Sequence, residues 1–435
     1  MHHLLPALLL AVPAISLAEE APVAAKKKGW ENIFTLLPPG SELKEVMLPR
    51  YDKDHQLTSV LKAQVMRLVN TQQIEGTTVA IEFFKPDNSP QGRIDLTTAL
   101  IDKEKNLLST KEPVKIRTDE GTADGTGVYY DFKLGKGVLL GPATTVFHLP
   151  PKETAMNPPD SPFRAMALVG MSLMTQSLLA APPPPITDAE LAAIQADATS
   201  RAPAAEAAAT KTLATLKTDL ADASAASQAA ATFLVQNDLP AITPDAAPAD
   251  AKPLDVKPGP DDTVISCDGA IYFDPEERVL VYLKNVIVKN PQFNATGRID
   301  ELKVFFAEKP VEEKDKVEDE KDKSGFGAGI GKSVGKAERV IATGAIVIDA
   351  KPKPGEDAVQ ASGAIFTYNL KSEEATLSGG FPWVRQGPKF LRAKKHDNLL
   401  RIYPKQNRFD TPGGGWEMGA PMDEINKDKK DKPNR

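Results

Sequence analysis

Apolar and polar residues alternate with a period of two over residues 41–150, the pattern of strands that bury one face. Val79, Ile81 and Phe83 fall on one side of a predicted strand, and residues 128–132 continue the alternation. Turns rich in Pro, Asp and Gly separate these stretches. The pattern therefore predicts a first β domain over this region.

The same alternation returns over residues 261–418. Residues 279–288 are almost continuously apolar and rich in β-branched side chains, and residues 340–348 predict a further long strand. Residues 308–336 combine a run of charges with a glycine-rich piece, which is typical of a solvated loop. We expect a second β domain here, followed by a disordered tail at residues 419–435.

Between the two β regions, residues 151–260 are rich in Ala and Pro. A run of four prolines predicts an extended segment, and Thr187 with Glu190 forms a capping box that opens an alanine-rich helix. Pro203 is expected to interrupt this helix before a second one over residues 204–235, which carries Leu213, Leu216 and Leu220 on one side. We therefore interpret the region as a partly helical spacer.

Residues 165–181 of the spacer approach the length of a membrane-spanning helix. They contain Ser172, Thr175 and Gln176, so their hydrophobicity is marginal. A span here would place two similar β regions on opposite sides of a membrane. We therefore favour a partly buried or interfacial helix, which leaves room for peripheral contact with a membrane.

A short glycine-containing unit recurs in the β regions. It is clearest at Asp268-Gly269-Ala270-Ile271, Thr343-Gly344-Ala345-Ile346 and Ser362-Gly363-Ala364-Ile365, with a looser echo at Thr296-Gly297-Arg298-Ile299. A glycine within a strand weakens it unless the sheet bends or another backbone approaches closely there. Because the spacing between the units is irregular, we predict an all-β fold of two curved jelly-roll domains rather than a periodic solenoid.

An apolar stretch near the N-terminus, residues 4–18, ends in Ser16-Leu17-Ala18, with small residues at the positions that precede signal cleavage. Residues 1–18 are therefore predicted to be a cleavable signal peptide, and the mature protein is expected in the periplasm. The single cysteine, Cys267, cannot form an intrachain disulfide, which avoids mispairing in an oxidising compartment.

Composition excludes some function classes. The net charge of −6 gives no overall electrostatic reason to expect nucleic acid as a partner, and one cysteine excludes a cysteine-based zinc or iron–sulfur site. Residues 325–333 end like a phosphate-binding loop, but Phe326 stands where that motif requires its first glycine. No nucleophile elbow is present. We expect no cofactor, no metal and no catalytic residue.

One enzymatic alternative stays open, because the two carboxylates of a glycosidase are close in space rather than in sequence. The acidic residues of this chain lie mostly in turns such as residues 274–277, where solvation is the ordinary explanation. We therefore rank an enzyme acting on carbohydrate below the non-enzymatic hypotheses.

Two sets of short motifs resemble the periplasmic bridge family of lipopolysaccharide transport. The first β region resembles LptC-type domains at LPRYDKD (48–54), LKA (61–63), GRID (92–95), STKEPV (109–114) and GTGVYYD (125–131). The second resembles LptA/OstA-type domains at ISCDG (265–269), LKNV (283–286), VIATG (340–344), ASGA (361–364) and LSGGFP (377–382). The spacer has no counterpart in this resemblance.

The resemblance implies a folded β jelly-roll whose apolar groove holds the acyl chains of lipopolysaccharide or a similar glycolipid. It also implies edge strands that pair with neighbouring bridge proteins or with a second copy. By alternation, the inward-facing candidates for lipid binding are Ile265, Ile271, Phe273, Leu302, Val304, Phe306, Ile346, Ile348 and Ile365, with Val79, Ile81 and Phe83 in the first region.

The function predicted from the sequence is thus a non-enzymatic periplasmic bridge for lipopolysaccharide, acting in outer-membrane biogenesis. The alternative is a structural module that assembles envelope proteins by strand pairing without a lipid ligand. The chain departs from LptC-type proteins, which keep an N-terminal membrane anchor, because cleavage is predicted after Ala18.

Overall fold

The computed structural model describes residues 37–51, 55–85, 87–118, 121–131, 134–148, 188–237, 239, 258–259, 262–290, 293–307, 337–350, 357–403, 408–412 and 415–419. The predicted signal peptide, residues 165–181, the loop at 308–336 with its glycine-rich piece, and the tail at 420–435 lie outside these residues. The described residues form 23 strands and one helix, so the all-β prediction is confirmed.

Ten strands precede the helix: β1 (Glu42–Tyr51), β2 (Leu57–Leu68), β3 (Gln73–Phe84), β4 (Pro90–Asp102), β5 (Leu107–Thr110), β6 (Val114–Thr118), β7 (Gly121–Gly125), β8 (Gly127–Asp131), β9 (Lys136–Leu140) and β10 (Ala143–Phe147). The helix is α3 (Asp188–Gln236). Thirteen strands follow it: β11 (Thr263–Cys267), β12 (Ala270–Asp274), β13 (Val279–Leu283), β14 (Ile287–Lys289), β15 (Phe293–Phe306), β16 (Ala337–Ala350), β17 (Val359–Asn369), β18 (Glu374–Ser378), β19 (Trp383–Gln386), β20 (Lys389–Ala393), β21 (Leu399–Tyr403), β22 (Arg408–Asp410) and β23 (Trp416–Gly419).

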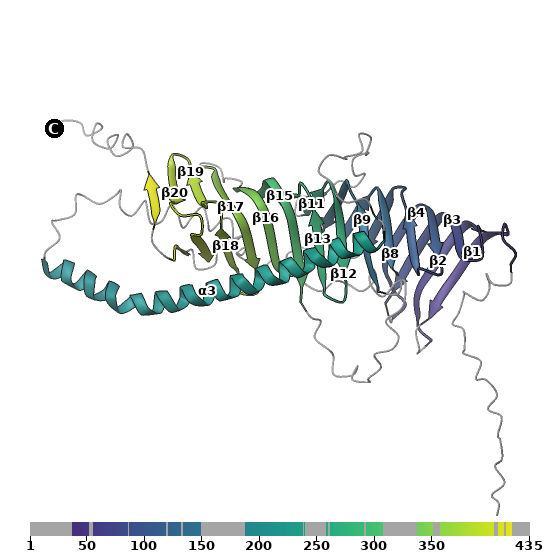
Figure 1. Ribbon diagram of the computed structural model, residues 1–435, viewed down its shortest axis with the longest axis horizontal. Coiled ribbons are helices and arrows are strands. Elements are labelled where there is room, and N and C mark those ends of the chain that lie inside the picture. The colour runs from purple at the N-terminus through teal and green to yellow at the C-terminus, as the bar shows by residue number, and fades with distance from the viewer. Residues whose placement is uncertain are drawn as a thin grey trace, which may run out of the picture.

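All strand pairs are antiparallel, and the order follows the chain along the long axis of the molecule (Figure 1). Strands β1 to β4 are consecutive neighbours, and at β4 the sheet divides into two branches. One branch runs through β6, β7, β10, β11 and β14, and the other through β5, β8, β9, β12 and β13. Both rejoin at β15, and the sheet divides again at β17.

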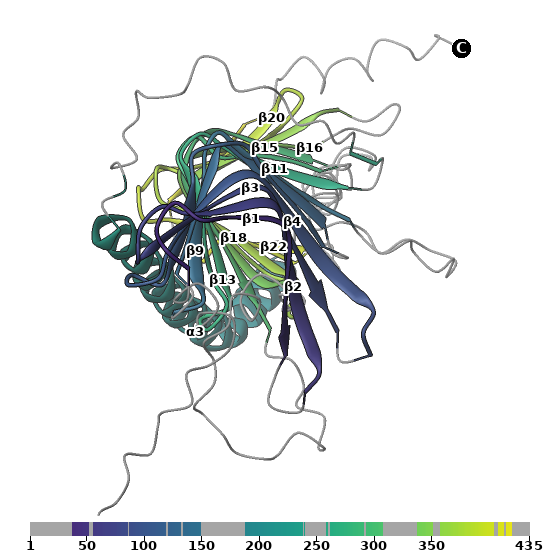
Figure 2. The same cartoon turned by 90° about the vertical axis from the view of Figure 1, so that its right-hand side faces the viewer.

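The two branches are the two arms of a folded sheet. Figure 2 shows the strands bent about a common crease, with β9 and β13 on the arm beside α3 and β4 on the arm away from it. We call the arm that carries β5, β8, β9, β12, β13, β18 and β21 the covered arm. The uncovered arm carries β6, β7, β10, β11, β14, β19 and β20. The long strands β1 to β4 and β15 to β17 cross the crease and contribute to both arms.

The crease shifts the apolar alternation by one residue. The interior side chains of β2 are spaced by two residues within each arm, as Leu61 and Ala63 or Met66 and Leu68, but Ala63 and Met66, on either side of the crease, are three apart. The same spacing separates Leu96 from Ala99 in β4 and Ile299 from Leu302 in β15. Because a strand turns successive side chains to opposite faces, this shift keeps the apolar side of both arms on the inside of the fold.

Two of the repeated glycines lie at this crease. Gly297 and Gly344 have φ values of +93° and +132°, and each lies close to the backbone of the other's strand, β15 or β16. A Cβ atom on Gly344 would lie 2.2 Å from the carbonyl oxygen of Arg298, and one on Gly297 would lie 2.3 Å from that of Ala345. These glycines therefore permit both the bend and the close backbone contact that the repeat predicted.

The two β regions form one continuous sheet. Strand β10 pairs with β11 from Ala143↔Cys267 to Phe147↔Thr263, and β9 pairs with β12 from Leu140↔Ala270 to Gly137↔Phe273. The spacer is thus inserted between two strands that are neighbours in the sheet. Whether each β region folds alone, with the predicted boundaries, stays a prediction.

Helix α3 lies along the outer face of the covered arm (Figures 1 and 2). The side chains that it buries recur at spacings of three, four or seven residues: Thr212, Asp219, Ala223, Ala226, Ala230 and Phe233. Near its C-terminus, Phe233 packs on Tyr272 of β12 with ring centroids 5.8 Å apart. This apolar contact fixes the helix over the middle of the sheet.

Polar contacts continue this attachment toward the N-terminal part of the helix. Arg339 of β16 pairs with both Asp219 and Asp222, the latter at 2.8 Å, and Ser227 donates to Glu301 of β15 at 2.7 Å. Because Arg339 is bound by two carboxylates and also lies over the ring of Phe305, it anchors the helix across neighbouring strands.

The prediction that Pro203 interrupts the helix was wrong, since α3 is continuous from Asp188 to Gln236. The alanine-rich sequence has a high helix propensity, which offsets the one backbone hydrogen bond that a proline removes. The leucine at position 213, expected on a common side with Leu216 and Leu220, is exposed. From Thr212 to Ala230 the buried side chains are instead small or polar, which lets the helix approach the sheet closely, and the large Phe233 follows near the C-terminus.

Replacing Gly344 with alanine should destabilise the protein by about 2 kcal/mol or more, because the new Cβ meets backbone and the φ value is unfavourable. Gly363 belongs to the same kind of repeat, but its added Cβ would meet first the side chain of Leu377 at 3.3 Å. Gly363→Ala is therefore the matched control and should cost less than about 1 kcal/mol. Urea unfolding followed by circular dichroism measures both, and equal losses would contradict the crease assignment.

The packing of α3 predicts a second pair of variants. Phe233→Ala should lower the free energy of unfolding by about 3 kcal/mol, because it leaves a cavity against Tyr272 and Val281. Val235→Ala, two residues away and 76% exposed, should change it by less than about 0.5 kcal/mol. A Phe233→Ala protein as stable as the Val235→Ala protein would show that the helix is not held by this contact.

Candidate functional site

The candidate site is the apolar interior between the two arms. One cluster of buried side chains runs from Ala63 in β2 to Ile402 in β21, with each member exposed by 9% or less. Ten of the twelve sequence candidates are members of this cluster: Val79, Ile81, Phe83, Ile265, Ile271, Leu302, Val304, Phe306, Ile346 and Ile348. Phe273 packs against it. Eleven candidates therefore share one interior, and their role in lipid binding stays a prediction.

Ile365 is the exception. Its neighbour Phe366 belongs to the cluster and Tyr368 packs against it, so Ile365 points to the opposite face of β17. Its half-buried side chain follows a register irregularity at the crease, between Thr343 and Ile346 of the partner strand. Simple alternation, which does not include this irregularity, predicted Ile365 on the interior face.

The interior also contains residues that were not among the candidates. The most deeply buried include Met66, Leu68, Ile74, Leu108, Tyr130, Leu139, Tyr282, Ile299, Leu377 and Ile402. The spacing of three between apolar residues at the crease is the sequence signal that could have identified several of them.

The cluster is continuous where the two β regions meet. Leu139 and Ala143 contribute from β9 and β10, and Ile265, Cys267 and Ile271 contribute from β11 and β12. Because these strands are paired across the insertion, the apolar cluster of one half continues into that of the other. An apolar path thus extends through both halves of the sheet.

Two hydroxyl groups form a polar contact inside this interior. The Tyr282 hydroxyl lies 2.8 Å from Thr145 Oγ1, and Thr145 Oγ1 lies 3.4 Å from the carbonyl oxygen of Ile265. Since Thr145 donates to the carbonyl, Tyr282 is the donor to Thr145. Desolvation in the apolar interior raises the pKa of Tyr282, so the phenol stays protonated.

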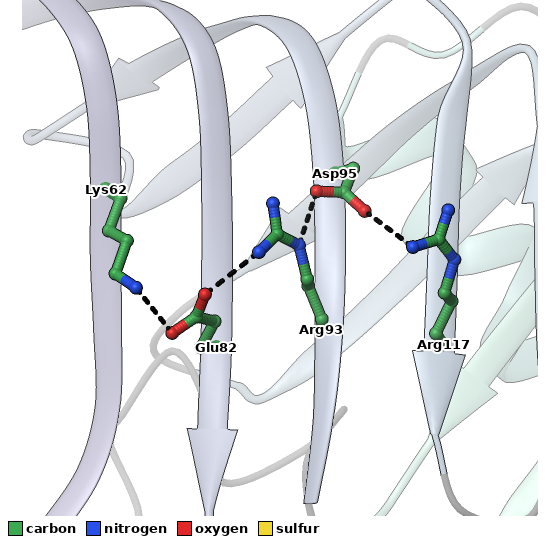
Figure 3. A network of polar contacts seen from close by, with 5 residues as sticks. All are labelled: Lys62, Glu82, Arg93, Asp95 and Arg117. Atoms are coloured by element: carbon green, nitrogen blue, oxygen red, sulfur yellow. Dashed lines mark hydrogen bonds and ion pairs between the residues drawn. The ribbon is translucent and has the colours of Figure 1, made fainter. Parts of the chain in front are cut away.

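The outer face of the uncovered arm is polar. Figure 3 shows a row of alternating charges across β2, β3, β4 and β6. Glu82 accepts from Lys62 at 2.8 Å and from Arg93 at 2.9 Å, Arg93 donates to Asp95 at 2.7 Å, and Arg117 lies 3.7 Å from Asp95. Each of these exposed ion pairs contributes little to stability. Together they make the outer face of the sheet polar, whereas its inner face is apolar.

The acidic turn that left an enzymatic alternative open is structural. Asp274 Oδ1 accepts from the backbone N–H groups of Glu276 and Glu277, both at 3.1 Å, and Oδ2 accepts from Lys136 and the Tyr272 hydroxyl at 2.9 Å. This carboxylate is fully occupied in holding the β12–β13 turn. Among the described residues, no group of His, Cys, Asp and Glu side chains is arranged to hold a metal ion.

Within the part of the chain that the structure describes, no helix combines the length and apolarity needed to cross a bilayer.

The position of Cys267 predicts an unreactive thiol. Burial raises its pKa to about 12, so at pH 8 only about one thiol in ten thousand is a thiolate. Native protein should therefore react with dithionitrobenzoate only very slowly, whereas protein unfolded in urea should release one thionitrobenzoate per chain at once. Rapid labelling of the native protein would contradict the burial of Cys267 in a filled interior.

The comparisons with known proteins give limited matches. No protein-family model matches the chain, and no curated protein does. Among solved structures, it is similar to the crystal structure of LptH, the LptA homologous periplasmic component of the conserved lipopolysaccharide transport device from Pseudomonas aeruginosa. The two are 14% identical with a TM-score of 0.26, and the similarity covers 37% of this chain and 94% of that one.

Proposed function

We propose that this protein is a non-enzymatic periplasmic bridge that carries lipopolysaccharide or a similar glycolipid toward the outer membrane, with the acyl chains between the two arms. The observation that carries the proposal is the single apolar cluster that continues through both β regions. The motifs that resemble LptC-type and LptA/OstA-type domains support it, as does the predicted signal peptide at residues 1–18.

The energetics of acyl chains favour a continuous interior. Each CH₂ group moved from water into an apolar environment gains about 0.8 kcal/mol, so a lipid crossing an aqueous compartment needs an apolar path without gaps. The interior side chains of this protein contact one another across the fold. Lipid would therefore enter by moving the arms apart and replacing contacts between them, at little net cost in buried area.

Both ends of the sheet offer edges for partner proteins. Strand β1 pairs with β2 alone among the described strands, and its Met47 and Tyr51 are exposed by 62% and 56%. At the other end, β22 pairs with β21 and β23 pairs with β20. Open edges accept further strands, and the β10–β11 pairing is an example within this chain. We propose other bridge proteins, or a second copy, as the partners.

The alternative function is a structural module that joins envelope proteins by strand pairing and binds no lipid. The observation in its favour is that protein side chains already fill the described interior. The two functions differ in one property, which is whether an acyl chain reaches inward-facing positions.

Photo-crosslinking tests this property. Benzoylphenylalanine at Ile81 or Ile346, one inward position in each β region, should form an adduct with purified lipopolysaccharide. The matched outward positions are Arg93 and Arg298, whose side chains are 46% and 77% exposed, and these should give no adduct. Adducts only at the outward positions, or none on folded protein, would favour the structural module. Lys303, although outward, is unsuitable as a control because it is buried on the face that α3 covers.

A further inference from the structure

Aromatic side chains pack together in the interior at the level where the two β regions meet. Tyr130 of β8 stacks on Phe273 of β12, with centroids 5.9 Å apart and planes inclined by 16°. Tyr282 of β13 lies one strand further on and is fully buried. We call the side chains of Tyr130, Thr145, Phe273 and Tyr282 the waist.

The hydroxyl contact at the waist joins opposite arms. Thr145 is on β10, which pairs with β7 and β11 of the uncovered arm. Tyr282 is on β13, which pairs with β12 and with the part of β15 in the covered arm. Backbone hydrogen bonds of these strands run along each arm, so the 2.8 Å contact between the hydroxyls is a link across the interior.

A phenylalanine at position 282 would bury the same ring without a polar atom. A buried hydroxyl must be paired, and the net gain of such a pair is about 1 kcal/mol, so stability alone does not call for one here. What the pair adds is a defined distance between two arms that otherwise meet through non-directional apolar contacts. When the pair breaks, two unpaired hydroxyl groups face the apolar interior. The free-energy cost of these unpaired groups is a barrier to separating the two arms at the waist.

The two arms differ in their freedom to move at the waist. Behind Tyr282, the outer face of the covered arm carries Val281 and Tyr272, which pack under Phe233 of α3. The uncovered arm has no described helix against it, and its row of exposed charges lies further along the sheet, on β2, β3, β4 and β6. Separation at the waist is therefore a movement of the uncovered arm away from an arm that α3 holds.

We propose that the Thr145–Tyr282 pair is a latch between the two halves of the interior, and that an acyl chain passes from one half to the other only when the latch opens. This inference rests on the proposed function, since it concerns how the same interior passes its ligand. Thr145 and Tyr282 are thus positioning residues that control the passage of the ligand between the two halves. The ligand is the acyl chain of a glycolipid.

Cys267 provides a probe of opening that is already in the chain. It lies on the same strand as Ile265, the acceptor of the Thr145 hydroxyl, and its side chain belongs to the interior cluster. The rate at which dithionitrobenzoate labels native protein therefore reports how often the waist opens. Tyr282→Phe and Thr145→Val each remove one hydroxyl with little change of shape, and each should raise this rate about fivefold.

Tyr272→Phe is the matched control, because it removes a buried tyrosine hydroxyl that donates to Asp274 on the outer face. It should leave the labelling rate within about twofold of the wild-type rate. The double variant Tyr282→Phe/Thr145→Val should label no faster than either single variant, since both remove the same contact. Urea unfolding of each variant verifies that labelling occurs from folded protein, and Thr145→Val carries the test if Tyr282→Phe does not fold.

The transfer step is measured with cis-parinaric acid, a fluorescent fatty acid, as the acyl-chain probe. Latch variants should exchange this probe several-fold faster than wild type, and Tyr272→Phe should not. If wild-type protein binds no probe and gives no lipopolysaccharide adduct, the proposed function fails. If wild type binds the probe but the latch variants label and exchange like Tyr272→Phe, the latch fails and the proposed function stands.

Discussion

A sheet with one apolar face must cover that face, and this chain does so by folding each long strand over itself. The fold depends on the crease, where one extra residue shifts the alternation of side chains. Without that shift, the apolar side chains of one arm would point outward while those of the other pointed inward. Gly297 and Gly344 allow the shift in β15 and β16, because a Cβ atom there would overlap the neighbouring backbone. The interior, both branches of the sheet and the candidate site follow from this local change.

The two arms solve the problem of their outer faces differently. The uncovered arm carries ion pairs such as that of Glu82 with Arg93, and these charged side chains stay hydrated on the exposed face. The covered arm carries Tyr272, Val279 and Val281 on its outer face, and α3 packs on them. The spacer is therefore part of the folded structure, and its small side chains allow close packing. Helix α3 thus supports the covered arm alone among the two.

A filled apolar interior and a lipid-carrying function are compatible when the two kinds of apolar contact have similar energies. Contacts between the arms and contacts of the arms with an acyl chain both remove hydrocarbon surface from water. Exchange between them then costs little, and directional contacts such as that of Tyr282 with Thr145 decide where the exchange is slow. In the described structure, contacts between the arms fill this interior.

The sequence by itself determined the β class, the bending at repeated glycines and the inward face of most strands, because alternation and backbone freedom are local properties. It therefore placed Val79, Ile271 and Ile346 in the interior, and it misplaced Ile365 because the shift at the crease depends on a partner strand. Only the tertiary structure decided that β10 and β11 join the two regions, that α3 covers one arm, and that Thr145 meets Tyr282. Each of these contacts joins residues far apart in the chain, so no local pattern encodes them.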